Sequence, residues 1–292
     1  MSKNKREHLA GAAAGAVAGI GYGAYSIFAR YALELDITRA TVLFLRFAGC
    51  VIIMWSYILI THKKWRLPLS KALCLIGVGA FVYSSMSAVN LAAIQIISGS
   101  LAGLILGFHP VFVLLFLLLT RKESMSVQKA VSLTACIAGL ALILNISDAS
   151  FSLPGIMLAF CASLLYTAYV ILGNFLKTDL HPVVPPAYIM LGVVLVYGMI
   201  GFLSRDISLS FPPAGWAIMS GMASISTALP ILLFWYSIEK LGAVKTCIIS
   251  SIEPLVTILL ELVIFGQHLT ALQLAGTAIL LAGIVVIQLK PS

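Results

Sequence analysis

Apolar runs of about twenty residues alternate with short polar segments along the whole chain. A helix that crosses the hydrocarbon core of a bilayer needs about 20 mostly apolar residues. With that length as the measure, the pattern predicts ten spanning helices, at about residues 9–30, 41–60, 71–95, 99–119, 127–145, 154–176, 185–203, 214–238, 243–265 and 271–289. The segments between them, such as Thr61-His62-Lys63-Lys64, are polar and too short for a soluble domain. We therefore expect an all-α integral membrane protein with ten transmembrane helices.

The composition supports this fold class and excludes several soluble ones. Hydrophobic residues make up 61% of the 292 residues and charged residues 10%, against roughly 45–50% and about 25% in soluble domains. The mean hydropathy is +1.09. So few charged side chains cannot cover a water-facing surface, which excludes a disordered chain and a soluble nucleic-acid-binding domain despite a net charge of +8. We expect membrane lipid around the protein and no nucleic-acid partner.

Lysine and arginine are unevenly divided between the two sides of the predicted helices. If the N-terminus lies in the cytoplasm, fourteen of the eighteen basic residues fall on the cytoplasmic side, three fall outside, and Arg46 lies within a helix. Short loops rich in Lys and Arg remain on the cytoplasmic side of a membrane. We therefore expect a multi-pass protein of the cytoplasmic membrane with both termini in the cytoplasm.

The chain contains an internal repeat at a constant offset of 144 residues. Nine identical pairs share this register without a gap: Gly11/Gly155, Tyr22/Tyr166, Ala24/Ala168, Tyr25/Tyr169, Ile27/Ile171, Pro68/Pro212, Gly77/Gly221, Pro110/Pro254 and Gly139/Gly283. The repeat divides the chain into residues 9–146 and 153–290, with five predicted helices in each. Because five is odd, consecutive copies cross the membrane in opposite directions. Transporters with such inverted-topology repeats bind substrate near the bilayer midplane between the halves; a duplicated structural protein without a cavity is the alternative.

Two stretches carry the most specific motifs. In the first half, Ser98-Gly99-Ser100-Leu101-Ala102-Gly103-Leu104 leads to His109-Pro110-Val111-Phe112. In the second half, Ile252-Glu253-Pro254-Leu255 leads to Phe265-Gly266-Gln267. These stretches resemble the drug/metabolite transporter (DMT) superfamily, specifically its EamA-type ten-helix members, although the family often has Glu where this chain has Gln267. The resemblance implies a carrier of amino acids, metabolites or drugs, commonly an exporter, with a central cavity between the halves.

His109 and Glu253 are ionisable residues in the middle of predicted helices. They are repeat equivalents before the shared proline, and each lies ten residues into its helix, about 15 Å along a hydrocarbon core of ~30 Å. The proline cannot donate to the carbonyl four residues back, which frees the carbonyls of Leu106 and Ser250. Because intramembrane ionisable groups are costly, we interpret Glu253 as a site for a proton or a cationic group of the substrate, with His109 as its partner. Structural capping by Glu253 is the alternative.

Arg46 and Glu261 are further ionisable residues within predicted helices. Both fall in the outer third of their helices, given the orientation above. We interpret them as an ion pair that gates the outer mouth, or as a purely structural pair.

Six further residues are candidates for lining the central cavity. Tyrosines spaced three residues apart share one face of a helix, and aromatic faces can bind aromatic or cationic groups. The alternative for each is interhelical packing. The candidates are Tyr22, Tyr25, Tyr83, Asn90, Tyr166 and Tyr169.

No motif indicates an enzyme, a metal or a cofactor. The sequence has no HExxH, GxSxG or GxxxxGK[ST] motif, and its five cysteines lie in apolar runs without metal-binding spacing. We expect a secondary transporter of a small-molecule substrate, with protons as the candidate coupling ion. A lipid or lipid-linked sugar flippase and a facilitative uptake carrier are the alternatives. The sequence indicates no oligomeric state.

Overall fold

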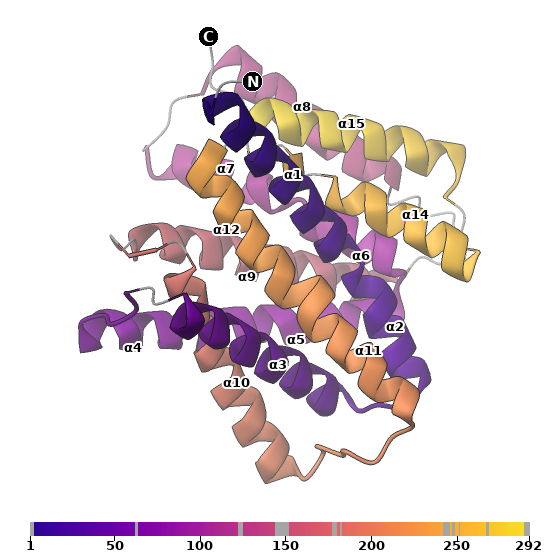
Figure 1. The fold of residues 1–292 in the computed structure, drawn as a ribbon. Coiled ribbons are helices and arrows are strands. Elements are labelled where there is room, and N and C mark those ends of the chain that lie inside the picture. Colours follow the sequence, from indigo (N-terminus) through magenta and orange to yellow (C-terminus); the bar gives the residue numbers. More distant parts are fainter. Residues whose placement is uncertain are drawn as a thin grey trace.

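The computed structural model describes residues 3–61, 64–121, 125–143, 152–176, 180–181, 183–241, 246, 249–250, 252–266 and 269–288. Within these ranges the regular structure is helical, with no strand (Figure 1). The first half contains α1 (Lys3–Gly23), α2 (Tyr25–Glu34), α3 (Arg39–Ile60), α4 (Leu69–Gly77), η1 (Val78–Tyr83), α5 (Ser84–Ile96), α6 (Gly99–Leu106), α7 (His109–Leu119) and α8 (Val127–Ile143). The second half contains α9 (Leu153–Phe175), α10 (Val184–Ser204), α11 (Pro213–Ala223), η2 (Ser224–Ala228), α12 (Leu229–Leu241), α14 (Glu253–Phe265) and α15 (Ala271–Gln288).

Most of the predicted spans are confirmed by helix length and composition. Seven helical stretches in the described part of the chain are long and apolar enough to cross a membrane: Glu7–Glu34, Arg39–Ile60, Leu69–Ile96, Gly99–Leu119, Leu153–Gly173, Val184–Ser204 and Pro213–Leu241. The predicted fifth and tenth spans correspond to the shorter apolar helices Val127–Ile143 and Ala271–Val286. The predicted ninth span is represented by α14, and much of its first half lies outside the described residues.

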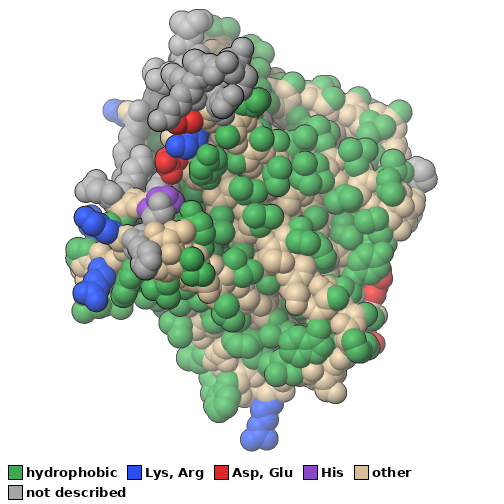
Figure 2. Space-filling view, in the orientation of Figure 1, with side chains coloured by type: hydrophobic (Ala, Val, Ile, Leu, Met, Phe, Trp, Pro, Cys, Tyr) green, Lys and Arg blue, Asp and Glu red, His purple; other side chains and the backbone are tan. Residues whose placement is uncertain are grey.

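The surface of the helices is strongly apolar. Hydrophobic side chains cover most of the face drawn in Figure 2, while charged side chains gather at its margins. Leu119 and Phe202 are each 83% exposed, and Val263 is 80% exposed. A continuous exposed apolar surface is unfavourable in water and is satisfied by lipid, so the fold is that of a membrane protein.

The fifth helices of the two halves, α8 and α15, pack against each other through reciprocal contacts. Gly139 of α8 lies against the backbone of Leu280, and Gly283 of α15 lies against Cys136. Cys136 and Leu280 are themselves separated by the repeat offset, so each helix presents the same positions to the other. A side chain at either glycine would hold the two helices apart.

The first helix of each half packs against the third helix of the other half. Helix α1 contacts α12, where Gly11 lies against Lys240, and α9 contacts α5, where its repeat equivalent Gly155 lies against Ile96. Lys240 and Ile96 are again repeat equivalents. Reciprocal contacts of this kind are what a pseudo-twofold relation between the halves produces. That the halves cross the membrane in opposite directions remains a prediction.

Both halves interrupt their third helix with a π-helical segment at matching positions. Segment η1 ends at Tyr83, and η2 contains Thr227, the residue that is equivalent to Tyr83 in the repeat. A π-bulge redirects side chains locally and occurs frequently at functional sites. These two residues therefore mark where the interior of the molecule deviates from regular helix packing.

Candidate functional site

Tyrosines from both halves lie together in the interior. Tyr83 meets Tyr169 of α9 with ring centroids 4.9 Å apart, and Tyr166 lies 5.6 Å from Tyr169. Tyr22 of α1 is close enough to interact electrostatically with the other three. All four side chains are half-buried. We refer to Tyr22, Tyr83, Tyr166 and Tyr169 as the tyrosine cluster; that it encloses a substrate cavity remains a prediction.

His109 borders this cluster at the start of α7. Its ring lies 4.5 Å from the ring of Tyr166, edge to face. Its Nδ1 is 3.2 Å from the carbonyl oxygen of Leu106, the group that Pro110 leaves without a helical donor, and Ser163 of α9 also donates to this oxygen at 3.2 Å. Because a carbonyl only accepts, Nδ1 carries the ring proton in this arrangement.

Glu253 occupies the equivalent position in the second half, at the start of α14. Its backbone carbonyl lies against Gly23, the residue after Tyr22, and its carboxylate is within electrostatic range of Tyr22 and Tyr83. Its side chain is half-buried and forms no ion pair with another described residue. The contact that we expected between Glu253 and His109 is not among the ion pairs or hydrogen bonds of the described residues; both side chains instead approach the cluster, His109 through Tyr166.

Arg46 of α3 is a buried cation beside the same residues. Its guanidinium lies 3.9 Å above the ring of Tyr25 and 4.7 Å from the ring of Phe47, and its Nε donates to the hydroxyl of Thr227 at 2.9 Å. It also interacts electrostatically with Tyr83. Within the described part of the chain, no carboxylate pairs with this guanidinium, which is only 8% exposed.

The predicted ion pair between Arg46 and Glu261 is wrong. Glu261 pairs with Arg30 of α2, with 3.6 Å between Oε2 and the guanidinium nitrogen, and its side chain is 1% exposed. Helix α2 packs against α14, whereas Arg46 is directed toward the rings of α2 and α3 and toward η2. The depth predicted from the sequence places Arg46 and Glu261 at a similar level in the membrane. Only the helix packing shows that Arg30, and not Arg46, reaches the carboxylate of Glu261.

Asn90 is a buried residue on α5, seven residues after Tyr83 on the same continuous helix. Its Oδ1 has no hydrogen-bond partner among the described residues. An unpaired buried amide oxygen is costly and is a candidate acceptor for a ligand or a water molecule. Its role in lining a cavity remains a prediction.

Four residues around this site were not identified from the sequence. Thr227 and Phe47 both contact Arg46. Ser163 donates to the carbonyl of Leu106, and Thr167 donates to the carbonyl of His109. Hydroxyl residues are common in transmembrane helices, so single Ser and Thr positions carry little signal. The one available signal was the repeat, which pairs Thr227 with the candidate Tyr83.

Comparisons with known proteins match two segments of the chain to one family. Residues 9–145 and residues 153–289 each match the model of the EamA-like transporter family. The chain is 24% identical over 215 residues to the uncharacterized transporter YyaM of Bacillus subtilis (strain 168), covering 71% of this chain and 69% of the relative. It is 22% identical over 284 residues to the uncharacterized transporter YcbK of the same organism, covering 93% and 90%.

A solved structure shares the fold. This crystal structure superimposes with a TM-score of 0.63 at 15% identity and covers 92% of this chain and 95% of its own. At this identity the likeness shows the fold alone.

Proposed function

Because the chain belongs to the EamA-like transporter family, we propose that it is a secondary transporter of small zwitterionic organic molecules, amino acids among them, which it exports across the cytoplasmic membrane by alternating access. The family and the apolar helices support a multi-pass membrane transporter. The cytoplasmic location of both termini is supported by the distribution of Lys and Arg.

The observation that carries this proposal is the pair of opposite charges beside the tyrosine cluster. Arg46 has no carboxylate partner and Glu253 has no cationic partner among the described residues, and both interact electrostatically with Tyr83. A buried charge without a counter-ion is unfavourable inside a membrane protein. A zwitterion supplies both counter-ions at once, its carboxylate to Arg46 and its ammonium group to Glu253.

The tyrosine cluster adds a surface for the body of such a molecule. Aromatic rings attract ammonium groups over their faces and pack against apolar or aromatic side chains. Rings from both halves contribute, since Tyr22 and Tyr83 come from the first half and Tyr166 and Tyr169 from the second. A molecule held there contacts both halves, which is what coupling of binding to their relative movement requires.

A counterflow experiment with three matched solutes tests the proposal. Purified protein in liposomes is given phenylalanine, its methyl ester, which lacks the carboxylate charge, and 3-phenylpropionate, which lacks the ammonium group. We expect saturable counterflow that is fastest for phenylalanine. Absence of saturable counterflow for these solutes and for a wider amino-acid panel would refute the zwitterion proposal.

Two variants assign the charges. A hydrogen-bonded charged group contributes about 1.5–3 kcal/mol, so Arg46→Gln is expected to weaken phenylalanine binding about tenfold to a hundredfold while leaving the methyl ester unchanged. Glu253→Gln is likewise expected to weaken phenylalanine binding, but it is expected to leave 3-phenylpropionate, which has no ammonium group, unchanged. Arg46→Lys, which keeps the charge, serves as the control for folding. Equal losses for all three solutes in both variants would show that these residues act only in structure.

A further inference from the structure

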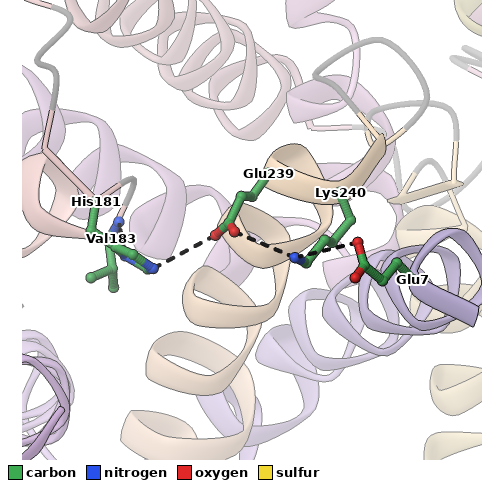
Figure 3. Close-up of polar contacts among 5 residues, drawn as sticks. All are labelled: Glu7, His181, Val183, Glu239 and Lys240. Atoms are coloured by element: carbon green, nitrogen blue, oxygen red, sulfur yellow. Dashed lines mark hydrogen bonds and ion pairs between the residues drawn. The ribbon is translucent and has the colours of Figure 1, made fainter. Parts of the chain in front are cut away.

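A chain of contacts between titratable side chains lies at the end of the molecule where α1 begins and α12 ends. His181, in the segment before α10, is 3.6 Å from Glu239 of α12; Glu239 is 3.6 Å from Lys240; and Lys240 is 4.0 Å from Glu7 of α1 (Figure 3). The backbone N–H of Val183 donates to His181 Nδ1, so the imidazole is neutral and Nε2, the nitrogen that faces Glu239, carries its proton. The ion pairs of the chain are those of Lys240 with Glu239 and with Glu7. The contacts join the segment before α10, the end of α12 and the start of α1.

The repeat identifies the corresponding place at the opposite end of the molecule. The equivalents of His181 and Glu239 are Ile37, in the segment before α3, and Gln95 of α5. These two residues cannot form an ion pair. Instead, both line a pocket of about 400 Å³ together with Asp36, Thr38, Arg39 and neighbouring residues. A side-chain contact and a pocket therefore occur at equivalent positions of the two halves, although Ile37 itself is only 4% exposed.

The two halves also differ in the burial of the residues at the start of α10 and at the start of α3. Val183 and Val184, at the start of α10, are 1% and 0% exposed. Their repeat equivalents at the start of α3 are Arg39, which is exposed, and Ala40, which is half-buried and lines the pocket. The start of α10 is thus packed in the interior, while the start of α3 borders a pocket.

We propose that the contact between His181 and Glu239, supported by Lys240 and Glu7, is a latch that holds the transport pathway shut at the end where α1 begins, so that this structure is the conformation open at the opposite end. The proposal rests on the alternating-access function proposed above. In a carrier with related halves, each half adopts the arrangement of the other when the pathway switches sides. In the switched state the latch opens, and the gap beside Ile37 and Gln95 closes without an ion pair to hold it. The latch therefore favours the conformation seen here.

The pseudo-symmetry supplies the test variants directly. His181→Ile with Glu239→Gln gives the latched end the residues of the open end. Ile37→His with Gln95→Glu gives the open end the residues of the latch. Opening is read from cysteines at Val184 and at Ala40, introduced in a background in which the native cysteines are replaced, by the rate of labelling with a membrane-impermeant maleimide from each side of the membrane.

The expected results are reciprocal. A solvent-exposed ion pair changes an equilibrium by up to about fivefold. His181→Ile with Glu239→Gln is expected to raise the labelling rate at the Val184 position and to lower it at the Ala40 position by about this factor. Ile37→His with Gln95→Glu is expected to lower the labelling rate at the Ala40 position. The single variant Glu239→Gln, at a half-exposed side chain, provides a milder version that is expected to fold normally.

Labelling distinguishes the latch from the substrate proposal because it requires no solute. Unchanged rates at both positions, or rates that rise at both positions together, would overturn the latch. Reciprocal labelling changes in a protein that shows no counterflow with any zwitterion would leave the latch standing and refute the proposed substrate class.

Discussion

Removal of Arg30 is predicted to destabilise the protein through the carboxylate that it leaves behind. Glu261 is 1% exposed, Arg30 is 31% exposed, and their charged atoms are 3.6 Å apart. The N-terminus of α6 also lies against this carboxylate, since Gly99 is directly beside Oε1. At this separation and an effective dielectric constant of about 20, the Coulomb attraction is about 4–5 kcal/mol. Because a third of Arg30 is in contact with solvent, we discount this to about 2–3 kcal/mol.

A double-mutant cycle measures this value. Arg30→Met is expected to lower the free energy of unfolding by about 2–3 kcal/mol, because a buried carboxylate loses its counter-ion. Glu261→Leu introduces the residue that occupies the equivalent position, Leu117, and is expected to cost less, because Arg30 keeps solvent and its stacking on Phe265 at 3.8 Å. The double variant is expected to be close to Glu261→Leu alone. Unfolding in mixed micelles with increasing dodecyl sulfate, followed by tryptophan fluorescence, gives the four free energies.

The matched control is the pair that depth in the membrane alone suggested. Arg46→Met combined with Glu261→Leu is expected to be additive within about 0.5 kcal/mol, because no contact joins the two residues. An additive result for Arg30 and Glu261, or a larger coupling for Arg46 and Glu261, would refute this assignment of the ion pairs.

Three further predictions follow from the same structure. Glu253→Gln is expected to abolish any stimulation of 3-phenylpropionate counterflow by a pH gradient while solute-driven counterflow of this solute remains, since the amide cannot exchange a proton; stimulation that persists in this variant would exclude Glu253 as the proton site. Gly139→Ala is expected to destabilise the protein by about 1–3 kcal/mol through overpacking against Leu280. Gly77→Ala, with no atom within 4 Å of the added Cβ, is expected to stabilise the protein by about 0.5–1 kcal/mol. Equal effects of the two variants on unfolding in dodecyl sulfate would contradict the close approach of α8 and α15. Tyr169→Ala is expected to weaken phenylalanine binding about fivefold or more relative to Tyr57→Ala, at an exposed position, when both are measured by counterflow inhibition.

Much of the fold was predictable from the sequence because a bilayer imposes a simple rule. Each span needs about 20 apolar residues, and that length alone locates the seven long helices that the structure confirms. The repeat at an offset of 144 residues likewise anticipates which positions of the two halves correspond, as Gly139 with Gly283 and Tyr83 with Thr227. The repeat also selects His109 and Glu253, whose prolines place them at the start of α7 and α14.

Partners across helix interfaces were not predictable in the same way. Hydropathy gives the depth of a residue in the membrane, but it does not give the rotation of its helix or the identity of the neighbouring helix. Glu261 shows the consequence, since its partner is Arg30, the last residue of the first predicted span. The π-helical turns and the position of Thr227 beside Arg46 also depend on how the third helix of each half packs.

The amino-acid order thus determined that this chain is a duplicated bundle of membrane helices. The reason is that the hydrocarbon core requires long apolar segments, and a repeat leaves the same residues at a constant spacing along the chain. Tertiary packing decided which charges meet across the helix interfaces. The reason is that the two halves have nearly the same helix pattern but different side chains at equivalent surfaces, so His181 and Glu239 contact each other where Ile37 and Gln95 line a pocket.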